Sequence, residues 1–158
     1  RLHEAGLIVP GGKVTGLMEE FRIVKRQLLL SARDALAAGG GYSAQRVLVC
    51  SPLPGEGKTF CATNLALAMA AERDLEVVLV DADFAKPSIL ALLGLPKGPG
   101  LMDALARPDI AVEDCVLSTD IPGFHVLPAG NRTDADSEYL SSERTRPVLD
   151  RLVQGAPN

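Results

Sequence analysis

Apolar residues recur along this chain with two different periods, and each period predicts a different kind of element. From about residue 17 to residue 38 they fall three or four positions apart, which is typical of an amphipathic helix. The glycines at 39–41 end this pattern, as glycines after a helix commonly do. Residues 1–16 mix glycine, proline and a short apolar patch, and we interpret them as an arm or linker.

Short uninterrupted apolar runs predict buried strands. The runs RVLVC at 46–50 and LEVVLVD at 75–81 are rich in β-branched residues, and a glycine-rich turn and a helical segment at about 58–72 lie between them. Strand, turn, helix and strand in this order predict a right-handed βαβ unit with parallel strands.

The second half of the chain continues with shorter elements. We expect short helices at 88–93 and 100–106, a third strand at 123–130, and a helical tail over 136–153 that Pro147 splits. Three strands are fewer than the roughly five or six of a usual open α/β sheet. We therefore expect an α/β fold whose chain stops partway through a larger domain.

The composition narrows the possible functions. Aromatic residues make up only 4% of the 158 residues, which disfavours a base-stacking surface, and a net charge of −4 gives no general attraction to nucleic acid or anionic lipid. The cysteines show no metal-type spacing, so we interpret Cys50, Cys61 and Cys115 as small buried hydrophobic residues. No apolar run approaches the ~20 residues of a membrane-spanning helix, which predicts a soluble, cytoplasmic chain.

The stretch SPLPGEGKTF at 51–60 carries the candidate chemistry. A loop between a buried strand and a helix can direct several backbone N–H groups at one anion, and the helix dipole favours that anion. Gly55 and Gly57 allow the backbone to approach a phosphate. Lys58 can reach the β- and γ-phosphates, and the Thr59 hydroxyl can bind Mg²⁺. The stretch therefore predicts a nucleotide site in a P-loop NTPase-like parallel sheet flanked by helices.

Two carboxylates, Asp81 and Asp83, follow the second predicted strand. The carboxyl ends of parallel strands face the ligand crevice of such a sheet, and alternate residues of an extended segment point the same way. One carboxylate could then orient a metal-bound water while the other acts as a base. The alternative is that Asp83 only caps the turn that follows.

The segments VCSPLPGEGKTFCATNLALAMA, VVLVDADFAKPSILALLGL, GLMDAL and HVLPAG together resemble the ATP-binding domain of bacterial tyrosine autokinases from capsule and exopolysaccharide loci, most of all the exosortase-associated branch. The resemblance implies that residues 17–158 are the N-terminal part of a P-loop kinase domain, with ATP and Mg²⁺ as cofactors. Pro52 fits this family, whose loop is commonly P-G-E-G-K-[ST] without a leading glycine.

The resemblance also implies a role for each matching residue. Lys58, Asp81 and Asp83 would be catalytic, and Thr59 would bind the metal together with the two aspartates. The nucleotide-binding loop would comprise Pro54, Gly55, Glu56, Gly57, Lys58, Thr59 and Phe60.

The chain departs from the family pattern in two places. The family's first helix carries E-x-x-R-x-x-R for ring-like self-association, and here Glu19, Arg22 and Lys25 match it with a lysine in the third position. Lysine lacks the planar fork of arginine, so bidentate pairing is weakened there. The alternative is that these three residues form one solvated helical face. Ala85 stands where many relatives have an arginine.

The resemblance further implies an autokinase that regulates exopolysaccharide or capsule synthesis or export. It would form a ring of its own copies, and a membrane-embedded polysaccharide co-polymerase or activator, or a fused segment, would attach it to the inner membrane. No nucleic acid partner is expected. The family's Walker B strand and tyrosine-rich tail have no match in the chain. We therefore expect this piece by itself to lack a complete catalytic site.

Two other functions stay open at this point. A partitioning or cell-division positioning ATPase of the MinD type shares the fold and the early aspartate. Its loop is K-G-G-x-G-K-[ST], however, and this chain has Leu53 and Pro54 in place of that lysine and the following glycine. The other alternative is a non-catalytic nucleotide-binding interaction module. Phosphotransfer to tyrosine would separate the kinase from both.

Overall fold

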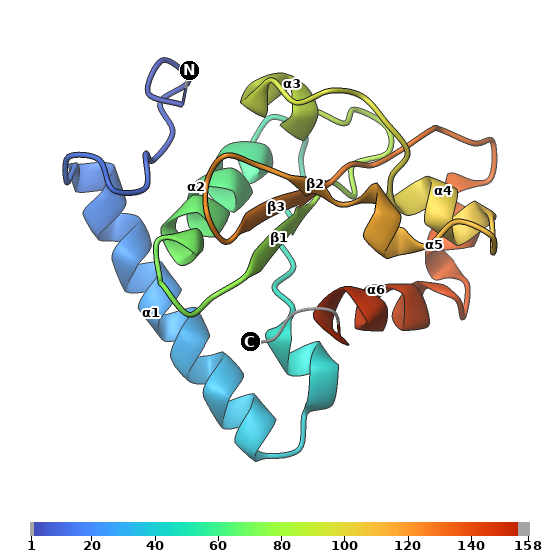
Figure 1. Ribbon diagram of the computed structural model, residues 1–158, viewed down its shortest axis with the longest axis horizontal. Helices are drawn as coiled ribbons and strands as arrows, with labels where there is room; N and C mark the ends of the chain where they lie inside the picture. The colour runs from blue at the N-terminus through green and yellow to red at the C-terminus, as the bar shows by residue number, and fades with distance from the viewer. Residues whose placement is uncertain (1, 155–158) are drawn as a thin grey trace.

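The computed structural model describes residues 2–154 and has a small β-sheet with helices on both sides (Figure 1). The sheet order is β1-β3-β2, in which β1 runs parallel and β2 antiparallel to the central β3. The elements in chain order are α1 (Gly16–Ala37), η1 (Gly41–Gln45), α2 (Lys58–Ala70), β1 (Val77–Val80), α3 (Ile89–Leu93), α4 (Leu101–Ala106), η2 (Val112–Cys115), β2 (Leu117–Ser118), β3 (Phe124–Leu127), α5 (Asp136–Ser141) and α6 (Thr145–Gln154).

The pleat of β1 divides its side chains between two hydrophobic cores, because successive residues of a strand point to opposite faces. Val77 and Leu79 pack in the first core, which also contains the apolar side of α2. Val78 and Val80 pack against the second core, beneath α4, η2 and α6. The buried residues of the first core are Leu7, Ile8, Ala66, Leu67, Ala68, Ala70, Leu79, Ile89, Phe124 and Val126. Those of the second core are Leu101, Ala104, Leu105, Val112, Cys115 and Leu127.

Helix α1 forms the outer flank of the molecule and packs on α2 (Figure 1). It begins where the Thr15 hydroxyl oxygen accepts the Met18 N–H at 3.2 Å, an N-cap that satisfies one otherwise unpaired backbone donor. Among the described residues of α1 only Lys25 is buried. The prediction of a helix over about 17–38 is thus confirmed, and most of its surface faces solvent.

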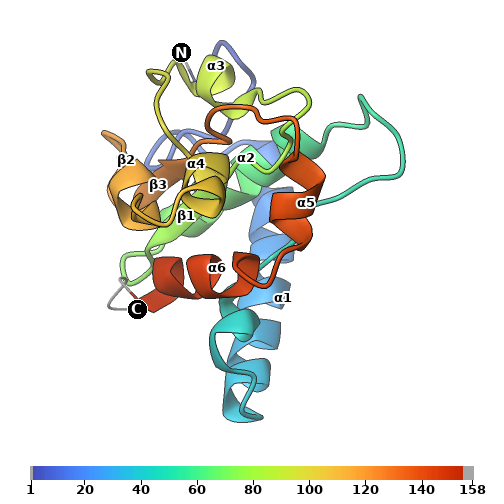
Figure 2. The same ribbon diagram turned by 90° about the vertical axis from the view of Figure 1, so that its right-hand side faces the viewer.

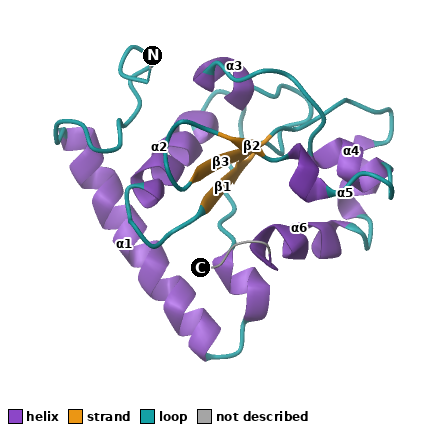
Figure 3. Cartoon of the chain, viewed as in Figure 1, coloured by secondary structure: helices purple, strands orange, loops and turns teal. Residues whose placement is uncertain are grey.

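The predicted strand at 46–50 is wrong. This segment has no strand partner within residues 2–154, and Leu48 is 85% exposed. Figures 2 and 3 show it as part of a loop that leads away from the sheet to α2. An apolar run becomes a buried strand only when a neighbouring strand accepts its backbone hydrogen bonds, and here β1 pairs with β3 alone. The predicted βαβ unit over 46–81 is therefore absent, and the parallel pair is β1 with β3.

Three smaller features of the structure differ from the sequence-based prediction. The two-residue strand β2 was not predicted, since Leu117 and Ser118 carry no recognisable alternation. The helical tail does divide in two, but α6 starts at Thr145 and contains Pro147 in its first turn, where a missing N–H is tolerated. Cys50 and Cys61 are exposed rather than buried.

Cys115 alone matches the expectation for the cysteines. It lies in the second core, where burial raises the pKa of its thiol, with further increases from the charges of Asp103, Asp114 and Glu113. Among the described residues, no helix combines the length and the apolar character needed to span a membrane.

Candidate functional site

The glycine-rich loop turns sharply into α2. Gly55 and Gly57 have φ values of +81° and +87°, in the left-handed region that favours glycine, and Gly57 is the N-cap of α2. This geometry places the backbone N–H groups that begin the 13-residue helix α2 at the end of the loop. The start of such a helix is an anion-binding position, because unpaired N–H groups and the positive end of the helix dipole coincide there.

The Lys58 side chain folds back over this loop. Its Nζ donates to the Ser51 hydroxyl oxygen at 3.0 Å and to the Leu53 carbonyl oxygen at 3.4 Å. The loop is further braced by Glu56, whose Oε2 accepts the Leu53 N–H at 3.2 Å. Two hydrogen bonds therefore hold the ammonium group against the start of the loop.

Thr59 connects the loop to the carboxylate that follows β1. Its Oγ1 lies 3.1 Å from the Ser88 Oγ, and the Ser88 N–H donates to Asp81 Oδ2 at 3.1 Å. The Ile89 N–H donates to the same oxygen at 3.2 Å. Asp81 is only 4% exposed and Thr59 is half-buried. The structure thus joins the two predicted motifs through Ser88, a residue that the sequence did not single out.

The two predicted carboxylates have different surroundings. The Asp81 side chain accepts three backbone N–H groups, those of Ser88 and Ile89 and, through Oδ1, that of Asp83 at 3.2 Å. Asp83 itself is exposed, and its Oδ1 accepts the Lys86 N–H at 3.0 Å, which braces the turn. The strand ends at Val80, so the alternation that predicted convergence no longer applies beyond it. A shared metal role for Asp81 and Asp83 stays a prediction.

The other predicted loop residues lie at the surface. Pro54, Gly55 and Glu56 are exposed, and Phe60 is 39% exposed on the first turn of α2. These positions leave the outer side of the loop accessible to a ligand.

The donor atoms near the loop fit Mg²⁺. The Thr59 hydroxyl and the Asp81 carboxylate offer hard oxygen donors, the type that Mg²⁺ prefers. Within residues 2–154 no three His, Cys, Asp or Glu side chains form a metal-holding cluster. Mg²⁺ does not need one, since it is usually bound by one or two protein groups together with water and phosphate oxygens.

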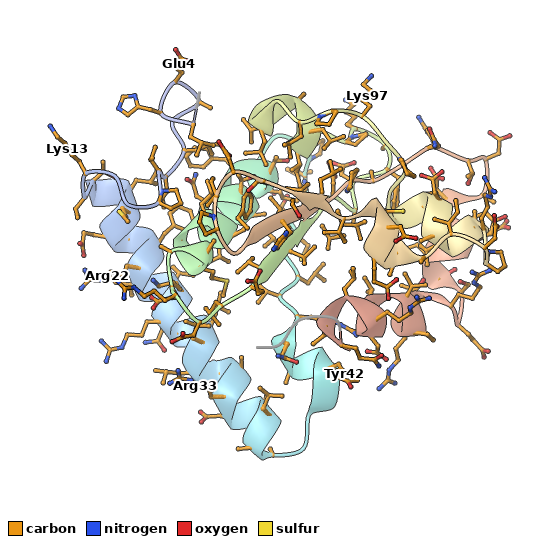
Figure 4. The ribbon with its side chains drawn as sticks, viewed as in Figure 1. Glu4, Lys13, Arg22, Arg33, Tyr42 and Lys97 are labelled. Carbon is orange, nitrogen blue, oxygen red and sulfur yellow. The ribbon has the colours of Figure 1, made fainter. Side chains whose placement is uncertain are left out.

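The candidate oligomerisation residues do not share one environment. Arg22 and Glu19 form an exposed ion pair of 3.2 Å on the outer side of α1, where Figure 4 shows Arg22 pointing into solvent. Lys25 instead turns inward and pairs with Glu72, just beyond the end of α2, at 2.5 Å. The alternative that all three residues form one solvated face is therefore wrong for Lys25, while their role in self-association stays a prediction.

The N-terminal arm reaches the helix that follows the loop. Leu7 and Ile8 are buried in the first core, and the Ile8 N–H donates to the Asn64 Oδ1 at 2.7 Å. Asn64 is fully buried on α2 and donates through Nδ2 to the Phe60 carbonyl oxygen at 3.1 Å. Sequence reasoning missed Asn64, although an amide within an otherwise apolar helix face was the available signal.

A second group at the carboxyl edge of the sheet holds α4 to the loop after β3. Asp103 accepts the Gly100 N–H, the Asn131 N–H and the Asn131 Nδ2, each at 2.9 Å. Burial by itself raises the pKa of Asp103, but the hydrogen bonds from Asn131 and Gly100 together outweigh it. The net pKa lies below the ordinary value of 3.8.

The free energy of unfolding should therefore depend on pH through Asp103. Because its pKa is lower in the folded than in the unfolded chain, the stabilisation is complete above about pH 4 and is lost as the pH falls through the folded pKa. We measure the free energy of unfolding in urea titrations at several pH values. Above about pH 4 it should be larger for wild type than for Asp103→Asn by a constant difference, and this difference should shrink at lower pH. A margin that stays constant down to about pH 2 would contradict this role.

The chain is similar in sequence to proteins named as tyrosine kinases and to one named as a polysaccharide transport protein. It is 30% identical over 108 residues to tyrosine-protein kinase Ptk of Acinetobacter johnsonii, covering 68% of this chain and 14% of that protein. It is 28% identical over 125 residues to tyrosine-protein kinase YwqD of Bacillus subtilis, covering 79% and 49%. It is 29% identical over 131 residues to the succinoglycan biosynthesis transport protein ExoP of Rhizobium meliloti, covering 80% and 16%. The chain thus spans at most about half of each of these relatives. No protein-family model matches it.

Solved structures give the same picture. The BceF tyrosine kinase domain superimposes with a TM-score of 0.71 at 27% identity, covering 87% of this chain and 51% of that domain. The VpsO kinase domain superimposes with a TM-score of 0.60 at 31% identity, covering 82% and 66%. The described residues therefore have the arrangement of part of these domains.

Proposed function

Because this chain belongs to the bacterial tyrosine autokinases, we propose that the protein that carries it binds ATP with Mg²⁺ and phosphorylates tyrosine on copies of itself. The observation that carries the proposal is the hydrogen-bonded path from Thr59 through Ser88 to Asp81. It brings a hydroxyl beside the phosphate-binding loop into one site with a buried carboxylate, as a metal-dependent phosphate site requires.

In the proposed reaction, the chain's own residues mainly position the reacting groups and neutralise the negative charge of the phosphates. The amides at the start of α2 and the Lys58 ammonium bind the β- and γ-phosphates. Thr59 and Asp81 would hold Mg²⁺, and the bound ion would supply positive charge to the phosphate oxygens. The tyrosine oxygen forms a bond to the γ-phosphorus while the bond to the bridging oxygen of ADP breaks. The hydroxyl proton leaves to a nearby carboxylate or to water.

The two aspartates would have different roles in orienting the metal and receiving the tyrosine hydroxyl. Asp81 is fixed by three backbone N–H groups, which suits a carboxylate that orients the metal and its water. Asp83, two residues later, is exposed and can face the incoming hydroxyl or support the metal from the solvent side. Phosphoryl transfer depends mostly on such positioning, so a carboxylate already held in place is what the site needs.

We further propose that this kinase acts in exopolysaccharide or capsule synthesis or export. The name of ExoP, which refers to succinoglycan biosynthesis and transport, supports this context. The protein would be peripheral to the inner membrane, attached through a polysaccharide co-polymerase, an activator or a fused segment. Self-association through α1 belongs to the same proposal, with the exposed Glu19 and Arg22 pair as its accessible part.

The test is phosphotyrosine formation by the purified natural protein that carries this chain. Incubated with Mg²⁺ and ATP, it should acquire phosphotyrosine detectable by mass spectrometry, and Asp81→Asn should lower the rate by about 100-fold or more. Asp74→Asn, at an exposed position between α2 and β1, is the matched control and should behave as wild type. If wild type never acquires phosphotyrosine but still hydrolyses ATP, the kinase proposal is wrong and a partitioning ATPase of the MinD type is favoured.

A further inference from the structure

Ser88 contacts both halves of the candidate site. Its side-chain Oγ lies 3.1 Å from the Thr59 Oγ1, and its backbone N–H donates to Asp81 Oδ2 at 3.1 Å. Thr59 belongs to the first turn of α2, whereas Asp81 follows β1, so Ser88 links two elements that are separate in sequence. The roles argued so far for Lys58, Thr59 and the aspartates do not explain why a hydroxyl stands at this position.

The usual explanation for a serine here does not apply. Ser88 is the N-cap of α3, a position where a serine side chain commonly accepts a backbone N–H of the helix. In this structure the Ser88 side chain makes no such capping bond. The carboxylate of Asp81 accepts the Ser88 and Ile89 N–H groups instead. The Ser88 hydroxyl is therefore directed at Thr59 while another residue performs the capping.

The Ser88 hydroxyl is also presented from a fixed backbone. Its own N–H and that of Ile89 are both bound by the buried Asp81 carboxylate. The Ile89 side chain is 5% exposed and packs in the first core, which anchors the start of α3. Because these contacts fix the backbone at Ser88, the Ser88 hydroxyl has a defined position and can orient the Thr59 hydroxyl.

We propose that Ser88 is a positioning residue for Thr59, and that its Oγ accepts a hydrogen bond from the Thr59 hydroxyl when the Thr59 oxygen binds Mg²⁺ beside a nucleotide. The inference rests on the proposed ATP and Mg²⁺ site. A threonine hydroxyl has one hydrogen to donate and two lone pairs. When one lone pair binds a cation, the hydrogen must point elsewhere to an acceptor, and Ser88 Oγ is within hydrogen-bonding distance. Outer partners of this kind orient metal ligands and typically change metal affinity by about 10- to 100-fold.

The experiment measures the Mg²⁺ dependence of nucleotide binding rather than catalysis. A fluorescent N-methylanthraniloyl-ADP is titrated into the natural protein that carries this chain, at several Mg²⁺ concentrations and in excess EDTA. We expect Ser88→Ala to raise the Mg²⁺ concentration needed for half-maximal tight binding by about tenfold. Affinity in EDTA should be unchanged, because only the metal-dependent part is affected. Ser88→Thr, which keeps the hydroxyl, should restore the wild-type Mg²⁺ response, and the exposed Ser137→Ala is the matched control.

Three results would overturn the inference. One is a Ser88→Ala variant with the wild-type Mg²⁺ response, and another is an equal loss of affinity with and without Mg²⁺, which would indicate a general change in the loop. The third is wild-type binding that does not depend on Mg²⁺ at all. Failure of the kinase proposal looks different, because phosphotyrosine would then be absent while Ser88 still controlled Mg²⁺-dependent binding.

Discussion

The Lys58→Met variant is expected to bind ATP at least about 100-fold more weakly than wild type. In the structure the Lys58 ammonium lies over the turn of the loop, within hydrogen-bonding distance of Ser51 and Leu53, beside the first amides of α2. There it can donate charge-assisted hydrogen bonds to two phosphates, each worth about 1.5–3 kcal/mol. Losing two such bonds costs roughly 3 kcal/mol or more, and each 1.4 kcal/mol is about a factor of ten in affinity. Methionine keeps the length of the side chain and removes the charge.

The matched control for Lys58 is Lys97→Met. Lys97 is exposed, and Figure 4 shows it pointing away from the body of the molecule beyond α3. Isothermal titration of Mg²⁺ and ATP into each variant gives the two affinities directly. Equal binding by wild type and Lys58→Met would show that the loop is not a phosphate site. Equal weakening in both lysine variants would indicate a general charge effect.

The largest loss of stability is expected for Phe124→Ala. Phe124 starts the central strand β3, is 1% exposed, and lies in the first core between α2 and the sheet. Removing a buried phenylalanine side chain leaves a cavity and costs about 3–5 kcal/mol. The whole stability of a domain is about 5–15 kcal/mol, so this single change removes a large fraction of it. We expect the variant to unfold at a much lower urea concentration than wild type.

Phe60→Ala is the control for this change, because it removes the same side chain from a position that is 39% exposed. Its cost should be clearly smaller, since less apolar surface returns to water. The free energy of unfolding of both variants is measured by urea titration followed by circular dichroism. If the slope of this free energy against urea concentration is unchanged, the same folded and unfolded states are being compared. Similar losses for the two variants would contradict the placement of Phe124 in the core.

The sequence was most informative where the controlling forces are local. The start of α2 at Lys58 follows from the glycine-rich turn before it, and the end of α1 follows from the glycines at 39–41. The strand that precedes Asp81 was recognised because its apolar residues are contiguous. These features depend on neighbours within a few positions, so a single sequence contains the information.

The sequence was least informative where the outcome depends on distant partners. Residues 46–50 have the composition of a strand, yet pairing depends on which edge of the sheet is next to them. The roles of Ser88 and Asn64 likewise depend on hydrogen bonds that span 29 and 56 positions in sequence. The amide of Asn64 within an apolar helix face was a local signal, but its partner Ile8 could not be read from the sequence, and no local pattern distinguishes Ser88 from an ordinary turn serine.

The buried arm changes where this domain can be cut. A boundary drawn at the start of α1, where the regular structure begins, would remove Leu7 and Ile8 from the first core. It would also leave the side-chain Oδ1 of Asn64, which is fully buried in the intact chain, without the Ile8 N–H that it accepts. An expression fragment should therefore include the arm, and an affinity tag should be attached before Leu2. Although its sequence is typical of a linker, the arm contributes Leu7 and Ile8 to the hydrophobic core.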